Sequence, residues 1–359
     1  MLFVSEAINE KTIYKRWEDY GFDKSFRKWF GGDAAVDKHK MRCLKNSLGP
    51  PHFKSGVWKL KVTVRKRTFP VILKVMKKGR PGNEIEFNLY RKAEKTLRDV
   101  IPQVYSVRTD GDYAWALTEH VRPISEQIEF HPKYFLKIVP ALAKLHARTF
   151  NKWQKDLYGD WLPFYHSDTM VKERKRMMKE TLRYLDEGMK QADLKAVLEP
   201  HYHRLQKIYK KGPIFFPEVI KAGLCITHND LQMRNMGCND VKKCEWNIKF
   251  LDWESAKFYP CWYDMVSLIG VFFGYRQDFK KDEERILRQC VRIYAREMRK
   301  NGVKFRKDPM KLYKMAYLQR VLEYDLYYHI TKGLHRKEIT LLPIFLDKIK
   351  RWGEELRLH

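Results

Sequence analysis

Short segments that alternate apolar and polar residues occupy the chain from about residue 38 to residue 121. Their β-branched content predicts strands at 41–48, 57–64 and 69–78, and two further strands flank the Asp110-Gly111 turn. Residues 83–97 interrupt these strands with apolar side chains at helical spacing. The pattern predicts a sheet with one helix between its strands.

Helical periodicity dominates the rest of the chain. Residues 135–149 carry an apolar stripe, and residues 265–273 are apolar enough for a central buried helix. Aromatic residues at near-helical spacing predict a helical segment within residues 1–35, which Gly31-Gly32 ends. Further helices are expected at 151–220, 284–298, 309–330 and 341–356. The whole pattern predicts an α+β protein whose sheet precedes its main group of helices.

Within residues 226–269, three of the carboxylates and one of the amides are candidates for chemistry. Asp230 and Asn235 lie five residues apart on an expected loop, Asp252 closes a short apolar strand at 248–251, and Asp264 opens an apolar helix. Transfer of a phosphoryl group needs a carboxylate that receives the proton of the attacking hydroxyl, and oxygen ligands that hold Mg²⁺. This set supplies both, although Asp and Asn are also common in surface turns, which is the alternative interpretation.

The order of these motifs resembles the aminoglycoside and choline kinase-like phosphotransferases, a branch of the protein-kinase-like fold. The matching segments are H-N-D-L-x-x-x-N at 228–235, D-W-E at 252–254 and Y-D-M-V at 263–266. The resemblance implies a two-lobe fold with an antiparallel-sheet N-lobe and a mainly helical C-lobe. It implies Asp230 as the catalytic base, Asn235 and Asp252 as Mg²⁺ ligands, and His228 and Asp264 as structural supports.

Lys74 stands inside the apolar strand segment VILKV. A lysine in such a setting needs an anion, and the phosphates of ATP would supply one. In the family a glutamate on the following helix steadies this lysine. The E-x-x-x-Y pattern selects Glu86, with Glu84 in reserve. The alternative is a solvent-facing lysine on an edge strand.

Further nucleotide contacts are expected from backbone groups. The loop at 49–56 ends in Ser55-Gly56 and resembles a phosphate-covering hairpin, although Pro50 and Pro51 remove two N–H donors. An ordinary hairpin is the alternative. The strand that ends near Pro123 falls at the hinge, where backbone groups of Glu119 and Val121 would bind adenine. The expected parts are an N-terminal helical extension (1–35), a nucleotide-binding N-lobe (36–121) and a C-lobe with the catalytic loop and acceptor site (122–359).

The chain carries a net charge of +28, from 72 basic and 44 acidic residues spread along its length. Such a field attracts polyanions such as nucleic acid, anionic lipid or acidic polysaccharide, unless it is only a solvated surface. It argues against a polycationic acceptor. In the family, helices inserted before the catalytic loop help to form the acceptor pocket. Arg174 and Arg183 in this region are candidates to face an anionic acceptor, with a solvated face as the alternative. Other residues are candidates to line the pocket or reach the acceptor, with simple packing as the alternative for the first four: Trp153, Trp161, Phe164, Tyr165, Tyr324, Asp325, Tyr327 and Tyr328.

The six cysteines form no C-x-x-C pair. Cys225, Cys238, Cys244 and Cys261 raise the alternative of a zinc site, but their spacing fits no zinc pattern. Reduced thiols in a cytoplasmic protein are the simpler expectation. No run of about 18 apolar residues and no signal-peptide pattern is present.

The sequence therefore predicts an ATP- and Mg²⁺-dependent phosphotransferase that acts on a hydroxyl of a small molecule, such as an amino alcohol, a sugar-like or an antibiotic-like acceptor. Choline is one candidate, because aromatic side chains can cage a quaternary ammonium. The alternatives are a kinase of an anionic glycolipid or cell-envelope sugar, a non-catalytic binding protein with this fold, and a nucleic-acid binder. The acceptor, the choice of ATP over GTP and the oligomeric state stay open.

Overall fold

The computed structural model describes residues 8–48 and 55–358, which form two compact units. The first unit combines Met1–Ile128 with Arg234–Ala256, and the second combines Glu129–Met233 with Lys257–His359. Each half of the chain thus contributes to both units, and the segment around Asp252 belongs with the sheet rather than with the helices.

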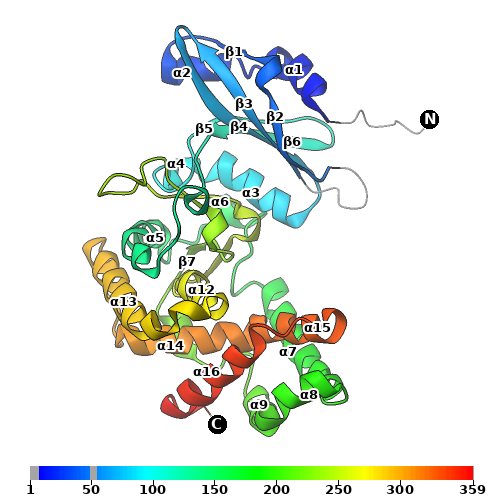
Figure 1. Cartoon of the computed structure of the whole chain (residues 1–359), viewed down its shortest axis with the longest axis vertical. Coiled ribbons are helices and arrows are strands. Elements are labelled where there is room, and N and C mark those ends of the chain that lie inside the picture. Colours follow the sequence, from blue (N-terminus) through cyan, green and yellow to red (C-terminus); the bar gives the residue numbers. More distant parts are fainter. Residues whose placement is uncertain (1–7, 49–54, 359) are drawn as a thin grey trace, which may run out of the picture. The chain divides into compact units, whose positions relative to one another are not determined.

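A six-stranded antiparallel sheet forms the centre of the first unit (Figure 1). Its hydrogen-bonded order is β1-β3-β4-β6-β5, with β2 also paired to β3. The strands are β1 Ala34–Val36, β2 Arg42–Asn46, β3 Ser55–Val64, β4 Arg67–Lys77, β5 Val104–Thr109 and β6 Tyr113–Glu119. Strand β1 is the one strand of this sheet that periodicity did not predict, because three residues are too few to show alternation.

The two faces of β4 differ, since alternate residues of a strand point to opposite sides. Val71, Leu73 and Val75 are fully buried in an apolar core. That core also holds Trp17 and Phe22 from the N-terminal segment, so the helices of residues 10–30 cover this face of the sheet. The opposite face of β4 carries Lys74 and receives helix α3 (Pro81–Lys92).

The returning segment 234–256 adds a small ribbon to the first unit. Strand β8 (Met236–Gly237) pairs with β9 (Lys249–Phe250). The amide of Phe250 donates to the carbonyl of Val100 at 2.7 Å, and the amide of Cys238 donates to the carbonyl of Arg122 at 3.0 Å. These bonds fix the ribbon to the loops that follow α4 (Glu94–Leu97) and β6.

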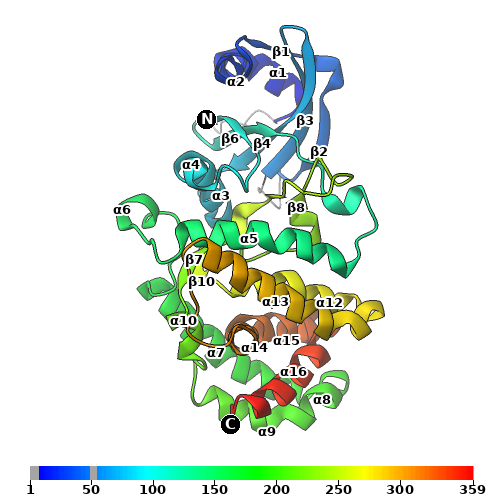
Figure 2. The ribbon, with the colours of Figure 1, turned by 90° about the vertical axis from the view of Figure 1, so that its left-hand side faces the viewer.

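The second unit is mainly helical (Figure 2). Its two strands, β7 (Leu224–Thr227) and β10 (Lys257–Pro260), pair antiparallel. Its α-helices are α5 Phe135–Thr149, α6 Lys155–Tyr158, α7 Asp168–Gly188, α8 Ala192–Leu198, α9 Tyr202–Tyr209, α10 Pro217–Lys221, α11 Tyr263–Met265, α12 Val271–Tyr275, α13 Glu283–Lys300, α14 Pro309–Arg320, α15 Leu326–Arg336 and α16 Leu342–Glu355. In the first unit the α-helices are α1 Glu10–Asp19, α2 Arg27–Phe30, α3, and α4 Glu94–Leu97.

Two π-helical segments interrupt helices that the sequence predicted as regular. Val266–Gly270 joins α11 to α12, and Val321–Asp325 joins α14 to α15. Such bulges occur often at functional sites and leave little trace in an apolar pattern. Asp264 lies inside α11 and not at its N-cap, which is Trp262, so its carboxylate is available to other partners.

Short 3-10 turns connect many of these elements: η1 Lys24–Phe26, η2 Lys38–Lys40, η3 Ile124–Glu126, η4 Pro132–Tyr134, η5 Glu199–His201, η6 Met233–Asn235, η7 Trp253–Ser255 and η9 Gln277–Asp282. No helix within residues 8–48 and 55–358 is both long and apolar enough to cross a membrane.

Candidate active site

Lys74 lies on the interior strand β4, between β3 and β6, and not on an edge strand. Its amine donates to Glu86 Oε2 at 2.5 Å and to Asp252 Oδ1 at 2.9 Å. Glu86 is 1% exposed, and its other oxygen accepts the hydroxyl of Tyr90 at 3.0 Å. Strand β4, helix α3 and the end of the β8–β9 ribbon thus bring one cation and two carboxylates together.

The charge of Lys74 is secured by its neighbours. Burial alone would lower the pKa of this amine, but the carboxylates of Glu86 and Asp252 outweigh burial and raise its pKa above the ordinary value. The amine therefore stays a cation and serves as a binding group rather than a base. Glu84, the reserve candidate, instead accepts the amide of Gly79 at 3.0 Å and stabilises the start of α3.

Asn235 and Asp252 stand at the same end of the β8–β9 ribbon. Met236 pairs with Phe250, and the amide of Leu251 donates to the carbonyl of Asn235 at 2.8 Å, which extends the ribbon by one pair. Asp252 follows with a left-handed backbone, φ +62°, and a side chain 41% exposed. An amide and a partly open carboxylate are oxygen donors of the kind that Mg²⁺ takes together with phosphate oxygens.

No cluster of three or more His, Cys, Asp or Glu side chains suited to a metal occurs among the described residues. Cys225, Cys238 and Cys261 are buried, and Cys244 is exposed.

The remaining nucleotide candidates also lie in the first unit. Ser55 and Gly56 open β3 and are buried, and a side chain at Gly56 would meet the ring of Trp58 at 2.3 Å. The rest of the expected phosphate loop, residues 49–54, lies outside the described residues. The amide of Glu119 donates to the carbonyl of Gln103 at 2.8 Å, so that group is engaged within the unit. Val121 follows β6 and is buried.

In the second unit, the carboxylate of Asp264 holds the loop that leads to Asp230. Its two oxygens accept the amides of His228 and Asn229, both at 2.7 Å. His146 Nε2 approaches the same carboxylate at 3.1 Å, and Asp264 is fully buried. Burial alone would raise the pKa of Asp264, but these hydrogen bonds and the nearby histidines hold its pKa below the ordinary value.

Asn229 adopts a left-handed backbone, φ +64°, which Asn tolerates better than most residues. Arg320, at the end of α14, donates from Nη1 to Asn229 Oδ1 at 2.8 Å and from Nη2 to the Asn229 carbonyl at 3.2 Å. The sequence analysis missed Arg320, because nothing in its helical segment separates it from a surface arginine. Asp230 itself is partly exposed and accepts Gln232 Nε2 at 2.5 Å.

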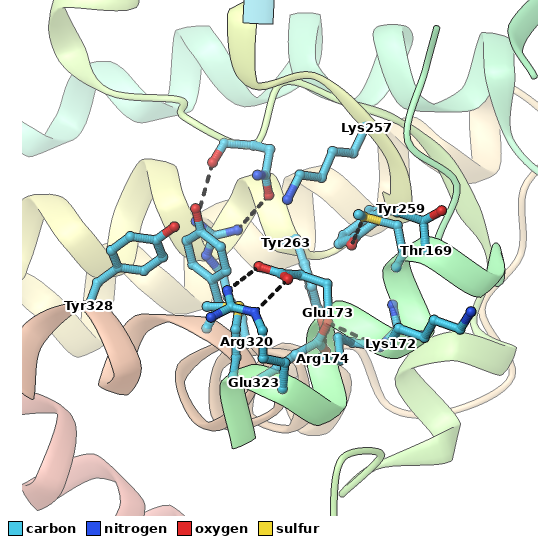
Figure 3. A pocket seen from close by; sticks show the side chains of 15 residues that line it. Thr169, Lys172, Glu173, Arg174, Lys257, Tyr259, Tyr263, Arg320, Glu323 and Tyr328 are labelled. Carbon is cyan, nitrogen blue, oxygen red and sulfur yellow. Dashed lines mark hydrogen bonds and ion pairs between the residues drawn. The ribbon is translucent and has the colours of Figure 1, made fainter. Parts of the chain in front are cut away.

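A cavity of about 570 Å³ opens beside Asn229 in the second unit (Figure 3). Its wall comes from α7, β10, α11, the end of α14, the following π-helical segment and α15, through Thr169, Met170, Lys172, Glu173, Arg174, Arg176, Met177, Asn229, Lys257, Tyr259, Tyr263, Arg320, Glu323, Tyr324 and Tyr328.

Of the acceptor-side candidates from the sequence, Arg174, Tyr324 and Tyr328 line this cavity. Arg183 does not line it. That side chain is 57% exposed and pairs with Glu187 at 3.0 Å. Trp153 stacks on Phe164 with ring centroids 4.4 Å apart and borders a separate cavity of about 460 Å³ in the same unit.

Searches with protein-family models and against curated proteins found no match. Solved structures do match. A choline kinase from Cryptosporidium parvum Iowa II aligns over 98% of this chain and 98% of its own, with TM-score 0.57 and 12% identity. An ethanolamine kinase from Plasmodium vivax aligns over 98% and 92%, with TM-score 0.53 and 14% identity.

A spectinomycin phosphotransferase, solved with ADP and spectinomycin, aligns over 91% of this chain and 98% of its own, with TM-score 0.52 and 10% identity. The chain has the fold of these small-molecule kinases. The predicted two-lobe, protein-kinase-like α+β fold is therefore confirmed. At these identities the likeness defines the fold, and the chemistry has to be argued from the residues.

Proposed function

We propose that this protein is an ATP- and Mg²⁺-dependent phosphotransferase that moves the γ-phosphoryl group to a hydroxyl of a small molecule. One observation carries the proposal: the amine of Lys74 bonds to both Glu86 and Asp252, at 2.5 and 2.9 Å. A protonated amine between a helix carboxylate and a partly exposed aspartate is the arrangement that phosphoryl transfer in this fold uses.

In this proposal Lys74 binds the phosphates of ATP, and Glu86 holds the amine in place. Asn235 and Asp252 are the candidate ligands of Mg²⁺, which when bound neutralises charge on the phosphates. The backbone of Val121, with that of Glu119, would bind adenine, and Ser55 and Gly56 would border the phosphates.

Asp230 is the proposed base. The acceptor oxygen forms a bond to the γ-phosphorus as the bond between that phosphorus and the β–γ bridging oxygen breaks. The hydroxyl proton passes to the Asp230 carboxylate, and ADP leaves. Because Asn235 follows Asp230 by five residues, the chain itself keeps the two within about 17 Å. Asp264 and His228 would hold the loop, as the two bonds from backbone amides to Asp264 suggest.

The first test measures nucleotide binding by thermal shift. We expect ATP with Mg²⁺ to stabilise the wild type and Asp230→Ala, and to stabilise Lys74→Met and Asp252→Ala much less. ADP release over a panel of hydroxyl compounds then measures transfer. We expect Asp230→Ala to lose about 100-fold or more in rate while it still binds ATP.

Lys221→Met, an exposed position on α10, is the matched control and should behave as wild type. Transfer that survives Asp230→Ala would refute the base assignment. Nucleotide binding without transfer to any acceptor would favour the non-catalytic alternative, and no response to ATP with Mg²⁺ would refute the proposed function.

A further inference from the structure

Lys257 enters the second-unit cavity from the first residue of β10. Its register partner is Thr227, the last residue of β7, so the β7–β10 pairing sets Lys257 beside the loop that leads to Asp230. Figure 3 shows its side chain reaching into the cavity. Any acceptor bound in this cavity would meet its amine.

The ammonium of Lys257 has no carboxylate at ion-pair distance within the described part of the chain, although Glu323 and Glu173 act on it from farther away. Within residues 8–48 and 55–358, its amine forms no hydrogen bond and no ion pair. It lies instead over the rings of Tyr259 at 4.9 Å and Tyr324 at 5.2 Å. A partly buried lysine without a carboxylate partner is costly and uncommon, and where it persists it calls for an anion from elsewhere.

Arg174, on the α7 wall, is a second cation of the cavity with unused hydrogen-bonding capacity. Its side chain is 5% exposed, and its Nε and Nη1 find no hydrogen-bond acceptor among the described residues. Its Nε forms an ion pair with Glu323 at 3.7 Å, a distance too long for a hydrogen bond. The guanidinium packs over the ring of Tyr165 at 3.9 Å. An unsatisfied buried guanidinium at the wall of a cavity offers two N–H donors to a ligand.

The acidic residues of the wall are already engaged. Glu173 holds Arg176 through two hydrogen bonds, at 2.7 and 2.9 Å. Glu323 accepts the hydroxyls of Tyr263 at 2.7 Å and Tyr165 at 3.2 Å, and also Gln319 Nε2 at 3.0 Å. The wall groups that remain able to bind a ligand are therefore cationic side chains and not carboxylates.

Electrostatics agrees with the geometry. Burial, reinforced by Arg320 and Arg174, lowers the pKa of Lys257 to about 8, although Glu323 and Glu173 act in the opposite direction. A bound anion would reverse this shift and draw the proton back to the amine. A cationic acceptor would instead meet Lys257, Arg174 and Arg320 at close range, which disfavours choline-like and ethanolamine-like substrates.

We propose that this cavity is the acceptor site and that Lys257 and Arg174 bind an anionic group, a carboxylate or a phosphate, on the hydroxyl compound to be phosphorylated. Calling this cavity an acceptor site rests on the proposed function. Tyr324 and Tyr328 would cover the uncharged part of the molecule. Arg320 stays committed to Asn229 and completes the positive field.

The test compares acceptors that share one ring and differ in charge: glucosamine, glucose, glucuronate and glucose 6-phosphate, with choline and glycerate as a short-chain pair. We expect ADP release to be fastest with anionic members, by about tenfold or more over neutral and cationic ones. Glucuronate and glucose 6-phosphate separate carboxylate from phosphate recognition.

Lys257→Met should raise KM for the anionic acceptors by about tenfold or more and leave KM for ATP unchanged. Lys257→Arg should restore most of the binding, and Lys221→Met is the matched control. Equal or better transfer to choline or glucosamine would overturn the anion assignment and leave the proposed phosphotransfer standing.

A binding assay decides the case in which no acceptor of the panel is phosphorylated. Sulfate is titrated into each variant in the presence of saturating ADP and Mg²⁺, and the thermal shift is followed. Weaker sulfate stabilisation of Lys257→Met and Arg174→Met than of wild type and Lys221→Met supports the site. The same response in all four proteins overturns it, whatever the outcome with ATP.

Discussion

Two lysines of this chain show how strongly the surroundings of a residue decide its role. Lys74 sits between Glu86 and Asp252, and its pKa is raised. Lys257 faces cations and aromatic rings, and its pKa falls to about 8. The first residue is a stable cation in its own network. The second is a cation that the folded protein holds at a cost, as a ligand-binding group would be.

That cost gives a prediction for the protein without ligand. The pKa of Lys257 is about 8 in the folded state against 10.5 for the unperturbed side chain. Between these two pH values the unfolded chain binds more protons than the folded protein, so the contribution of Lys257 to stability rises with pH. Below about pH 8 the amine is charged in both states, and the folded protein bears the full cost of burying that charge. Lys257→Met should therefore stabilise the protein at pH 7, by on the order of 2 kcal/mol.

Urea unfolding at pH 7 and pH 10 measures this difference between wild type and variant. The gain from Lys257→Met should shrink at pH 10, because the folded wild type has by then lost its charge at this residue and no longer holds a buried cation. A variant that is less stable than wild type at pH 7 would show that the lysine serves packing rather than ligand binding.

At the scale of elements, the loop from β7 to Asp230 is held by two helices from distant parts of the chain. Asp264 on α11 binds two consecutive amides of the loop, and Arg320 on α14 binds the side chain and carbonyl of Asn229. Since Asn229 has a left-handed backbone, these bonds determine the direction in which the next residue, Asp230, leaves the loop.

The guanidinium fork of Arg320 is therefore expected to position the base. Arg320→Lys keeps the charge but cannot make both bonds to Asn229. We predict a fall in kcat of about 10- to 100-fold with little change in KM for ATP, because the first unit is untouched. Steady-state kinetics on the best acceptor checks this. Arg183→Lys, on the exposed face of α7, is the matched control. An unchanged kcat would refute the positioning role.

At the scale of the whole molecule, the N-terminal helices share the core of the first unit. Trp17 is buried there, and its indole donates to the carbonyl of Ala34 at 3.0 Å. Trp17→Ala should destabilise the first unit by about 3–5 kcal/mol. The core of the second unit contains none of these residues, so its own unfolding should be little affected.

In scanning calorimetry, the unfolding transition of the first unit should move to lower temperature while that of the second unit stays in place. ATP with Mg²⁺ should raise the temperature of the first unit's transition. Tyr14→Ala, 47% exposed on the same helix, is the control. If Trp17→Ala and Tyr14→Ala melt alike, the N-terminal segment is dispensable to the first core.

The sequence predicted elements well where apolar spacing was regular. The strands now seen as β3 and β4, helix α5 and helix α13 all follow from local pattern, because burial of one face imposes a fixed period. It predicted less well where local spacing carries little information. Strand β1 is too short to show a period, and the π-helical turns at 266–270 and 321–325 shift the helix phase by one residue.

The candidate site divides in the same way. A lysine inside an apolar strand and a D-x-x-x-x-N loop are visible in the sequence, and their proposed roles remain predictions. Arg320 and Lys257 were not visible, since their meaning depends on neighbours elsewhere in the chain. Arg320 bonds to Asn229, which is 91 residues away in the sequence, and Lys257 pairs with Thr227, which is 30 residues away.

By itself the sequence determined the order of strands and helices and the chemical types available for phosphoryl transfer, because periodicity and residue type are local properties. Only the tertiary structure decided that Glu86 and not Glu84 reaches Lys74 and that Asp264 turns to a loop rather than to its own helix. It also decided that Arg174 and Lys257 reach one cavity, where Arg174 keeps unbonded N–H donors and Lys257 has no carboxylate partner among the described residues. These are outcomes of long-range packing, in which the burial of a charge and the distance to its partner are fixed by residues far away in the chain.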